Sequence, residues 1–234
     1  MTKSQNVGFR VFTKVNRPPR ELMAEFARME STHVGDVMNR FGGMDVNIRP
    51  AGPTMRFCGP AVTVRVAPGD NLMVYKAFEV AQPGDVLVIE SHGFTNVAQW
   101  GDLTSMLALR LGLGGAVMDG SLRDLEGIQK VGFPVFAKPV VVPNGSLKDG
   151  PGEVNVPVAV GGVPVLPGDV VLADANGVVV VPRADAEVVL AKAKKVAAAE
   201  AKKVAEIEGG HLTADWLEGT LKQKGCEIVD GSWE

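Results

Sequence analysis

The middle of the chain alternates short, valine-rich apolar stretches with stretches that place apolar residues at helical spacing. The alternation of apolar residues predicts a strand at 61–67, and helical spacing predicts a helix at 71–81. Further strands are predicted at 83–91, 116–119, 135–138, 157–160, 170–174 and 178–182. This mixture of elements indicates an α/β fold.

Both ends of the chain are predicted to be helical, with helices at 19–30 and 32–40 and a long helix from Ala184. The long helix is rich in Ala, Lys and Glu and stops at Gly209-Gly210. Because its apolar stripe is thin, we expect it to pack on a neighbouring subunit. No low-complexity linker divides the chain, so we predict one α/β domain over 1–183 and a C-terminal helical arm over 184–234.

The tripeptide Pro-Gly-Asp occurs three times, at 68–70, 83–85 and 167–169. Proline sets φ in advance, glycine permits a positive φ, and aspartate accepts hydrogen bonds from nearby backbone. We therefore expect the same turn at all three places.

Composition excludes several classes of protein. The net charge is -3, aromatic residues are sparse, and no basic tract lies outside 192–203, so no nucleic-acid partner is expected. No run of 18 apolar residues exists, and the first residues show no apolar leader, so we expect a cytoplasmic protein without a membrane segment. The two distant cysteines fit neither a disulfide framework nor a zinc motif.

Residues 101–124 carry charge at both ends: twenty residues separate Asp102 from Arg123, and Asp124 follows Arg123 directly. One interpretation is structural: Asp102 would be the N-cap of one helix, and Ser121 with Asp124 would form a capping box on the next. The other interpretation is a site. Both helices would follow strands of one sheet, so both N-termini would lie at the sheet edge where ligands bind.

The chemistry of these side chains suits a small acid and a cation. Helix N-termini offer N–H groups to a carboxylate, and Arg123 offers the N–H donors of its planar guanidinium group to a carboxylate or an enolate. Asp102 and Asp124 would hold a hard divalent cation, one directly and one through water, since Mg²⁺ keeps several waters. Lys138, at a predicted strand end, is the alternative Schiff-base residue, although an exposed structural lysine is the commoner case.

The D-x20-R-D pattern resembles the signature of the class II pyruvate aldolases of the RraA-like family. Supporting stretches are THVGDVMNR (32–40), GPAVTVRVAPGDN (59–71), PGDVLVIE (83–90), GGAVMDGSLRD (114–124) and VLPGDVVLADANGVVVVP (165–182). The resemblance covers roughly residues 30 to 210. It implies a layered β/β/α fold, similar to the swivelling domain of phosphohistidine proteins, and a homotrimer or homohexamer with its active site between subunits.

The resemblance also implies roles for individual residues. Asp124 would bind the divalent cation, Mg²⁺ or Mn²⁺; Asp102 would act through metal-bound water; Arg123 would bind the substrate and stabilise the enolate. The backbone that would hold the pyruvyl carboxylate is that of Gly101, Asp102, Leu103 and Thr104. A glutamate from a neighbouring subunit's C-terminal helix would contribute, and the candidates are Glu200 first, with Glu206 and Glu208 as alternatives.

The implied activity is metal-dependent cleavage of 4-hydroxy-4-methyl-2-oxoglutarate-type 2-oxo acids to pyruvate, with oxaloacetate decarboxylation as a side activity. The alternative is a regulatory binding protein that acts on a ribonuclease, as some RraA-like proteins do. The long tail after VVVVP favours the aldolase, because the shorter regulators lack most of it. No part of the sequence identifies what holds the distal end of the substrate, so the particular oxo acid stays open.

Overall fold

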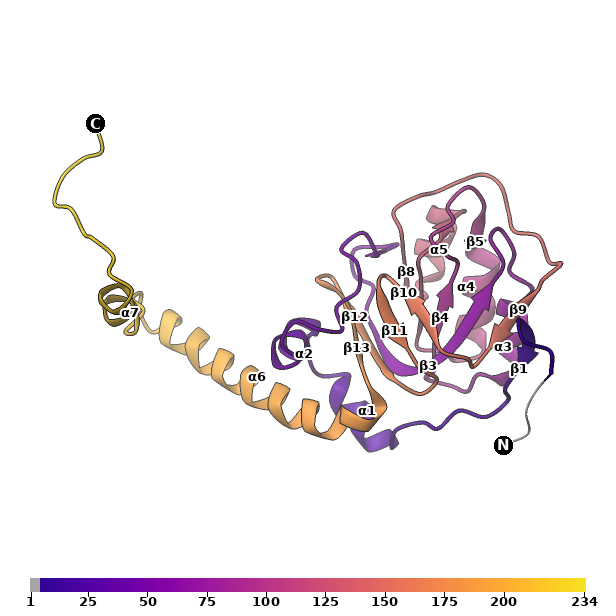
Figure 1. Ribbon diagram of the computed structural model, residues 1–234, viewed down its shortest axis with the longest axis horizontal. Helices are drawn as coiled ribbons and strands as arrows, with labels where there is room; N and C mark the ends of the chain where they lie inside the picture. The colour runs from indigo at the N-terminus through magenta and orange to yellow at the C-terminus, as the bar shows by residue number, and fades with distance from the viewer. Residues whose placement is uncertain (1–4) are drawn as a thin grey trace. The chain divides into compact units, whose positions relative to one another are not determined.

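The computed structural model describes residues 5–234 (Figure 1). The chain divides into two compact units, Met1–Val196 and Ala197–Glu234. The helices of the first unit are α1 (Arg20–Phe26), α2 (Ser31–Val37), α3 (Leu72–Val80), α4 (Asp102–Arg110), α5 (Leu125–Val131) and the first part of α6 (Ala186–Glu208).

The main sheet has the strand order β1-β9-β3-β4-β6-β8-β2, and β3, β4, β6 and β8 run parallel to one another. Its strands are β1 (Phe9–Val11), β2 (Arg49–Pro50), β3 (Phe57–Val66), β4 (Val86–Glu90), β6 (Gly115–Met118), β8 (Val135–Ala137) and β9 (Gly152–Val154). The hairpin β12 (Val170–Asp174) and β13 (Gly177–Val181) joins this sheet through β3. Two separate pairs are β5 (Ala98–Trp100) with β7 (Ser121–Leu122) and β10 (Val158–Val160) with β11 (Val163–Val165).

Strand β3 connects two layers of the first unit. Its first residues pair with β12, and its later residues pair with β4 and β9. One apolar core lies about the main sheet, while a second core forms where α1, α2 and the start of α6 cover the β12–β13 hairpin. In that second core Phe26 of α1 and Leu190 of α6 are buried with Val179 of β13.

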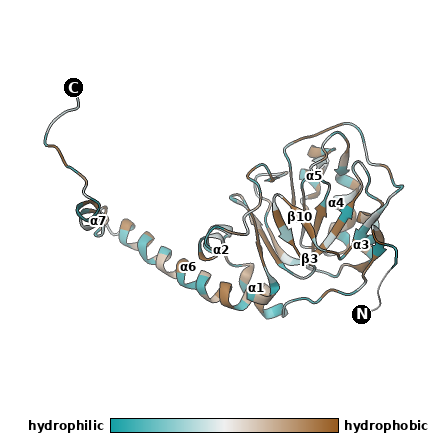
Figure 2. Cartoon of the chain, viewed as in Figure 1, coloured by the Kyte–Doolittle hydropathy of each residue, from teal (hydrophilic) through white to brown (hydrophobic). Residues whose placement is uncertain are grey.

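The structure confirms the predicted mixed α/β fold and its long C-terminal helix. Every predicted helix and strand overlaps an observed element, and α6 ends immediately before Gly209 and Gly210. Figure 2 shows that apolar residues concentrate in the strands of the first unit, which is why their pattern is readable in the sequence. The short strands β1, β2, β5, β7, β9 and β11 were not predicted, because each has two or three residues and lacks the uninterrupted apolar run that marks the equally short β8 and β10.

The three Pro-Gly-Asp turns adopt the same conformation. Their glycines have positive φ angles of 78°, 90° and 90° for Gly69, Gly84 and Gly168. Asp85 accepts a hydrogen bond from the Gln82 N–H at 2.7 Å, and Asp169 accepts one from the Leu166 N–H at 2.9 Å. Asp70 uses its carboxylate differently: it bonds to a distant loop, and this loop shapes the pocket described below.

The start of α6 packs on its own domain. Ala186, Val189, Leu190 and Ala193 are all buried in the second core. The second unit begins at Ala197 and contains the rest of α6 and α7 (Leu217–Gln223). Most of its large apolar side chains are exposed, and Trp216 and Trp233 are examples. Packing of this second unit on a neighbouring subunit stays a prediction, as does the expected boundary at residues 183 and 184.

Candidate active site

Two short parallel strands bring the starts of α4 and α5 together. Strand β5 leads into α4 and strand β7 leads towards α5, and the two strands pair, with Ala98 opposite Ser121. The Arg123 N–H donates to the Trp100 carbonyl at 3.0 Å, which extends the pairing to the residue before Asp124. The helix starts therefore lie side by side as expected, although their strands form a separate pair outside the main sheet.

Asp102 is not the N-cap of α4, so that prediction was wrong. Gly101 occupies the N-cap position, and Asp102 is the first residue of the helix. The hydroxyl of Thr104 accepts from the Gly101 N–H at 2.9 Å and donates to the Gly101 carbonyl at 2.8 Å. The Asp102 carboxylate bonds only locally, accepting from the Leu103 N–H at 2.7 Å through Oδ1. The Thr104 side chain therefore caps the helix start, and Oδ2 of Asp102 has no part in this capping.

The capping box predicted for the second helix was also wrong. Ser121 lies in β7, where its hydroxyl donates to the Val97 carbonyl at 3.1 Å. Asp124 is the N-cap residue of α5, but its side chain makes no capping hydrogen bond. Its φ of 54° is left-handed, a conformation that aspartate tolerates better than most residues. This backbone turn directs Asp124 towards Arg123, whose Nε lies 3.3 Å from Oδ2 of Asp124.

Two glycines allow the acidic side chains to approach the opposite helix start. A Cβ at Gly101 would lie 2.9 Å from Oδ2 of Asp124. In the same way, a Cβ at Gly127 of α5 would lie 2.8 Å from the Cβ of Asp102. Both contacts are closer than a real Cβ permits without a shift. Asp102 thus packs on α5 and Asp124 packs on the residue before α4, so the D-x20-R-D residues form one cluster.

A third glycine sets the position of Arg123. Gly145 belongs to the loop between β8 and β9, and a Cβ there would lie 2.4 Å from Nη1 of Arg123. The guanidinium therefore lies directly against the loop backbone. The loop is held in place because the Ala98 N–H donates to the Asn144 carbonyl at 2.9 Å. The side chain of Ser146 donates to the Ala98 carbonyl nearby.

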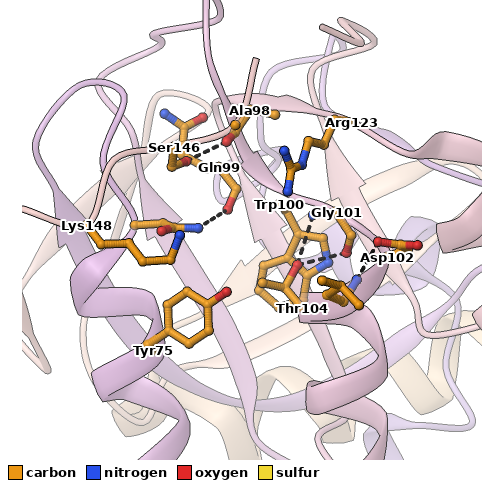
Figure 3. A pocket seen from close by; sticks show the side chains of 13 residues that line it. Tyr75, Ala98, Gln99, Trp100, Gly101, Asp102, Thr104, Arg123, Ser146 and Lys148 are labelled. Carbon is orange, nitrogen blue, oxygen red and sulfur yellow. Dashed lines mark hydrogen bonds between the residues drawn. The ribbon is translucent and has the colours of Figure 1, made fainter. Parts of the chain in front are cut away.

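The cluster borders a pocket of about 290 Å³, drawn in Figure 3. The predicted residues that line it are Gly101, Asp102, Leu103, Thr104 and Arg123. Asp124 does not line the pocket, but it contacts Arg123 and lies against Gly101. Lining residues that the sequence did not reveal are Asn71, Tyr75, Ser146 and Lys148. Figure 3 shows Tyr75 and Lys148 on the side of the pocket opposite Arg123.

The carboxylates fit a hydrated cation better than a closed metal cage. Within residues 5–234, no group of three or more His, Cys, Asp or Glu side chains gathers to hold a metal. Asp102 and Asp124 each offer hard oxygen atoms, and the Asp124 side chain is 45% exposed. Mg²⁺ prefers such a set, with one or two carboxylates and several waters. The residues present therefore fit a cation that keeps most of its own water.

Two other side chains with reactive groups, Lys138 and Cys58, lie outside the pocket. Lys138 is half-buried and donates from Nζ to the Gly93 carbonyl at 3.4 Å, which gives it a structural partner. Burial raises the pKa of the Cys58 thiol to about 12, so this cysteine stays protonated and unreactive. Both residues thus have structural partners or surroundings away from the pocket, and Lys138 is half-buried where an exposed lysine was expected.

The candidate tail glutamates Glu200, Glu206 and Glu208 all lie on α6 in the second unit. Glu206 pairs with Lys203 at 3.2 Å. Their approach to the site of a neighbouring subunit stays a prediction.

Of the helices in the described part of the chain, none is both long and apolar enough to cross a membrane.

Residues 31–180 match the model of a known family, which is described as RraA-like, Aldolase/RraA. The chain belongs to the RraA-like family. The match contains the whole D-x20-R-D cluster and the pocket-lining loop. The family includes aldolases as well as RraA proteins, so membership alone leaves the activity open.

Curated relatives in the family carry provisional aldolase names. A protein of Halalkalibacterium halodurans, provisionally named a 4-hydroxy-4-methyl-2-oxoglutarate aldolase, is 39% identical over 122 residues, which cover 52% of this chain and 58% of that protein. One of Albidiferax ferrireducens with the same provisional name is 33% identical over 113 residues, covering 45% of this chain and 65% of that protein. The chain thus matches less than two thirds of the length of these relatives.

Solved structures show the same fold. An uncharacterised protein from Pseudomonas syringae pv. tomato superposes with a TM-score of 0.74 at 26% identity, covering 84% of this chain and 92% of that one. The RNA-processing inhibitor RraA from a Thermus species superposes with a TM-score of 0.60 at 32% identity, covering 65% of this chain and 92% of that one. These likenesses cover about two thirds or more of the chain and include a protein whose title describes an RNA-processing inhibitor.

Proposed function

We propose that this RraA-like protein is a divalent-metal-dependent pyruvate aldolase that cleaves 4-hydroxy-4-methyl-2-oxoglutarate-type 2-oxo acids. The observation that carries the proposal is the cluster itself. Two helix starts, Arg123 and two carboxylates meet at the edge of a pocket of the size of a small acid. The aldolase names of the curated relatives support the same conclusion.

The first turn of α4 binds the substrate carboxylate in this proposal. Helix starts carry N–H groups without intrahelical acceptors and a partial positive charge, so they suit an anion. Arg123 lies beside this turn at the same end of the pocket and donates to the 2-oxo oxygen. Together they hold the pyruvyl part of the substrate in one orientation.

Bond cleavage then follows a retro-aldol course. The C3–C4 bond breaks, its electron pair becomes the pyruvate enolate, and the C4 hydroxyl becomes a carbonyl as its proton leaves. Asp102, acting through an intervening water, accepts that proton, and Arg123 stabilises the negative charge on the enolate oxygen. A Mg²⁺ or Mn²⁺ ion bound by Asp124, with Asp102 holding one of its waters, would supply Lewis-acid stabilisation of the same charge. Oxaloacetate decarboxylation passes through the same enolate and is the expected side activity.

A regulatory role on a ribonuclease is the second candidate. Its support is the likeness to the Thermus RraA, whose title describes an inhibitor of RNA processing. Such a role requires a surface that binds another protein, and it does not require that the chain catalyse a reaction. The two candidates therefore separate on whether the chain releases pyruvate.

The deciding experiment measures pyruvate release from 4-hydroxy-4-methyl-2-oxoglutarate and from oxaloacetate, with Mg²⁺ and with EDTA. We expect EDTA to abolish release and Asp124→Ala to lower kcat/KM by at least about a hundredfold, since both remove electrostatic stabilisation of the enolate. Asp36→Ala, which removes an exposed carboxylate on α2, is the matched control and should retain activity. A folded wild-type protein that releases no pyruvate with Mg²⁺ would favour the regulatory role.

A further inference from the structure

The wall of the pocket opposite Arg123 comes from two segments that are distant in sequence. Asn71 and Tyr75 stand at the start of α3, and Ser146 and Lys148 belong to the loop between β8 and β9. Nζ of Lys148 lies 5.7 Å from the centre of the Tyr75 ring, so the charged head of the lysine is near the aromatic face. Figure 3 shows this pair facing the α4 start across the pocket.

A buried aspartate fixes the two segments to each other. Asp70 is 3% exposed, and its Oδ2 accepts from the N–H groups of Asp149 at 2.6 Å and Gly150 at 3.0 Å. The loop also pairs with the chain before α3, because the Asn71 N–H donates to the Leu147 carbonyl at 3.0 Å. Lys148 lies between these anchored residues, so its backbone is held at the pocket.

The charges of the pocket are distributed at two ends. Arg123 and Asp102 lie at one end with the helix start, and Lys148 is the ionised side chain at the other. A ligand with one carboxylate would use only the first end. A ligand with carboxylates at both ends of a short chain would meet a cation at each of them.

The polar side chains on this wall differ in their ability to donate a hydrogen bond to an anionic ligand. The Ser146 hydroxyl already gives its proton to the Ala98 carbonyl, so it positions the loop and cannot donate to an anion. Lys148 has three N–H donors, and the hydroxyl of the partly exposed Tyr75 is a further donor. Asn71 is 7% exposed; its amide donates to the Gln99 carbonyl at 3.3 Å, while its Oδ1 accepts from no described residue.

We propose that Lys148, assisted by the Tyr75 hydroxyl, forms a distal subsite that binds the second carboxylate of a dicarboxylic 2-oxo acid. The proposal rests on the proposed function for the orientation of the ligand, since the α4 start holds the other carboxylate. The unpartnered Oδ1 of Asn71 accepts a hydrogen bond from a hydroxyl group that the ligand carries between its two carboxylates. The subsite gives the enzyme a preference for dianionic over monoanionic substrates.

The test compares two ligands of equal chain length, 2-oxoglutarate and 2-oxopentanoate, which differ in the distal carboxylate. Binding is measured by titration calorimetry in Mg²⁺ with the wild-type chain and with Lys148→Met. We expect the wild type to bind 2-oxoglutarate at least about fivefold more tightly, as one charge-assisted contact at a partly exposed site provides. Lys148→Met should weaken the binding of 2-oxoglutarate about fivefold and leave the affinity for 2-oxopentanoate within about twofold of the wild-type value. Tyr75→Phe should show a smaller effect of the same kind.

The matched control is Lys130→Met, which removes an exposed lysine from the last turn of α5 and should leave both affinities unchanged. Lys148→Arg should keep the preference for the dicarboxylate. The subsite is overturned if the wild type binds both ligands equally, if it fails to bind 2-oxoglutarate, or if Lys148→Met weakens both ligands alike. Selective binding without any pyruvate release would instead overturn the proposed aldolase and leave the subsite standing.

Discussion

The two walls of the pocket are built in different ways. The wall that carries Arg123 comes from a single stretch, residues 101–124, which forms two helix starts joined through one strand pair. The wall that carries Lys148 comes from two segments more than seventy residues apart, and the buried carboxylate of Asp70 joins them. Chemistry that resides in one stretch is visible as a motif. Specificity that depends on a long-range hydrogen bond has no local pattern.

The largest expected loss of activity comes from a substitution in the loop of the Lys148 wall that displaces Arg123 on the other wall. Gly145→Ala would place a Cβ 2.4 Å from Nη1 of Arg123 and push the guanidinium away. A displacement of about 1 Å at such a group costs on the order of a hundredfold in rate, so we expect kcat/KM for pyruvate release to fall by about that factor. The unfolding midpoint in urea should change little.

Gly35→Ala is the control for this change, because a Cβ at Gly35 of α2 meets nothing within 4 Å. It should leave the rate unaltered and should not lower stability, since alanine favours a helix. Equal activity of Gly145→Ala and the wild type would show that the two walls do not depend on each other.

The second effect tests whether Asp70 holds the Lys148 wall together. Asp70→Asn replaces one acceptor oxygen by an NH₂ group, which would face N–H donors that need an acceptor. We expect a loss of about 1–3 kcal/mol in the free energy of unfolding by urea, the usual cost of unsatisfied buried donors. The preference for 2-oxoglutarate over 2-oxopentanoate should fall with it.

Asp149→Asn is the matched control for Asp70→Asn, because Asp149 is exposed and contributes its backbone N–H to the loop anchor. It should leave both stability and ligand preference near those of the wild type. An Asp70→Asn chain with unchanged ligand preference would contradict the role of this carboxylate in shaping the wall.

The smallest effect comes from a carboxylate outside both walls. Burial alone would raise the pKa of Asp174, but hydrogen bonds from Ser31 and Asn176 outweigh it and hold that pKa below its ordinary value of 3.8. Because the folded pKa is the lower one, the stabilisation is present above pH 3.8 and is lost as the pH falls through the folded pKa. Acid should therefore loosen the contact between α2 and β12.

Asp174→Asn should lower the free energy of unfolding by about 1 kcal/mol at neutral pH, the usual value of a helix-start contact, and should flatten its dependence on acid. Urea unfolding between pH 3 and pH 7 measures both effects. Ligand binding should be unaffected, since Asp174 lies outside the pocket-lining set. A change in ligand preference would show that the walls are coupled to the rest of the sheet.

The elements that sequence analysis located correctly are those with enough residues to show a period. Strand β3 and helix α6 are examples, and the Pro-Gly-Asp turns were located because in each the Asp N–H donates to the carbonyl three residues before it. The predicted caps at Asp102 and Ser121 were wrong for different reasons. The Thr104 hydroxyl, two residues after Asp102, bonds to the Gly101 backbone and completes the cap locally, whereas the Ser121 hydroxyl donates to the Val97 carbonyl, a partner that only the folded chain brings near.

The α/β fold, the helix that begins at Asp102 and the stretch that carries Asp102, Arg123 and Asp124 could be predicted from the amino-acid sequence alone. These depend on local propensity and on hydrophobic periodicity, which are properties of adjacent residues. Packing between distant segments, by contrast, places Gly101, Gly127 and Gly145 against the charged side chains and sets Lys148 across the pocket from Arg123. The reason is physical: these are contacts between segments far apart in the chain, and steric fit and buried hydrogen bonds at long range leave no local periodicity.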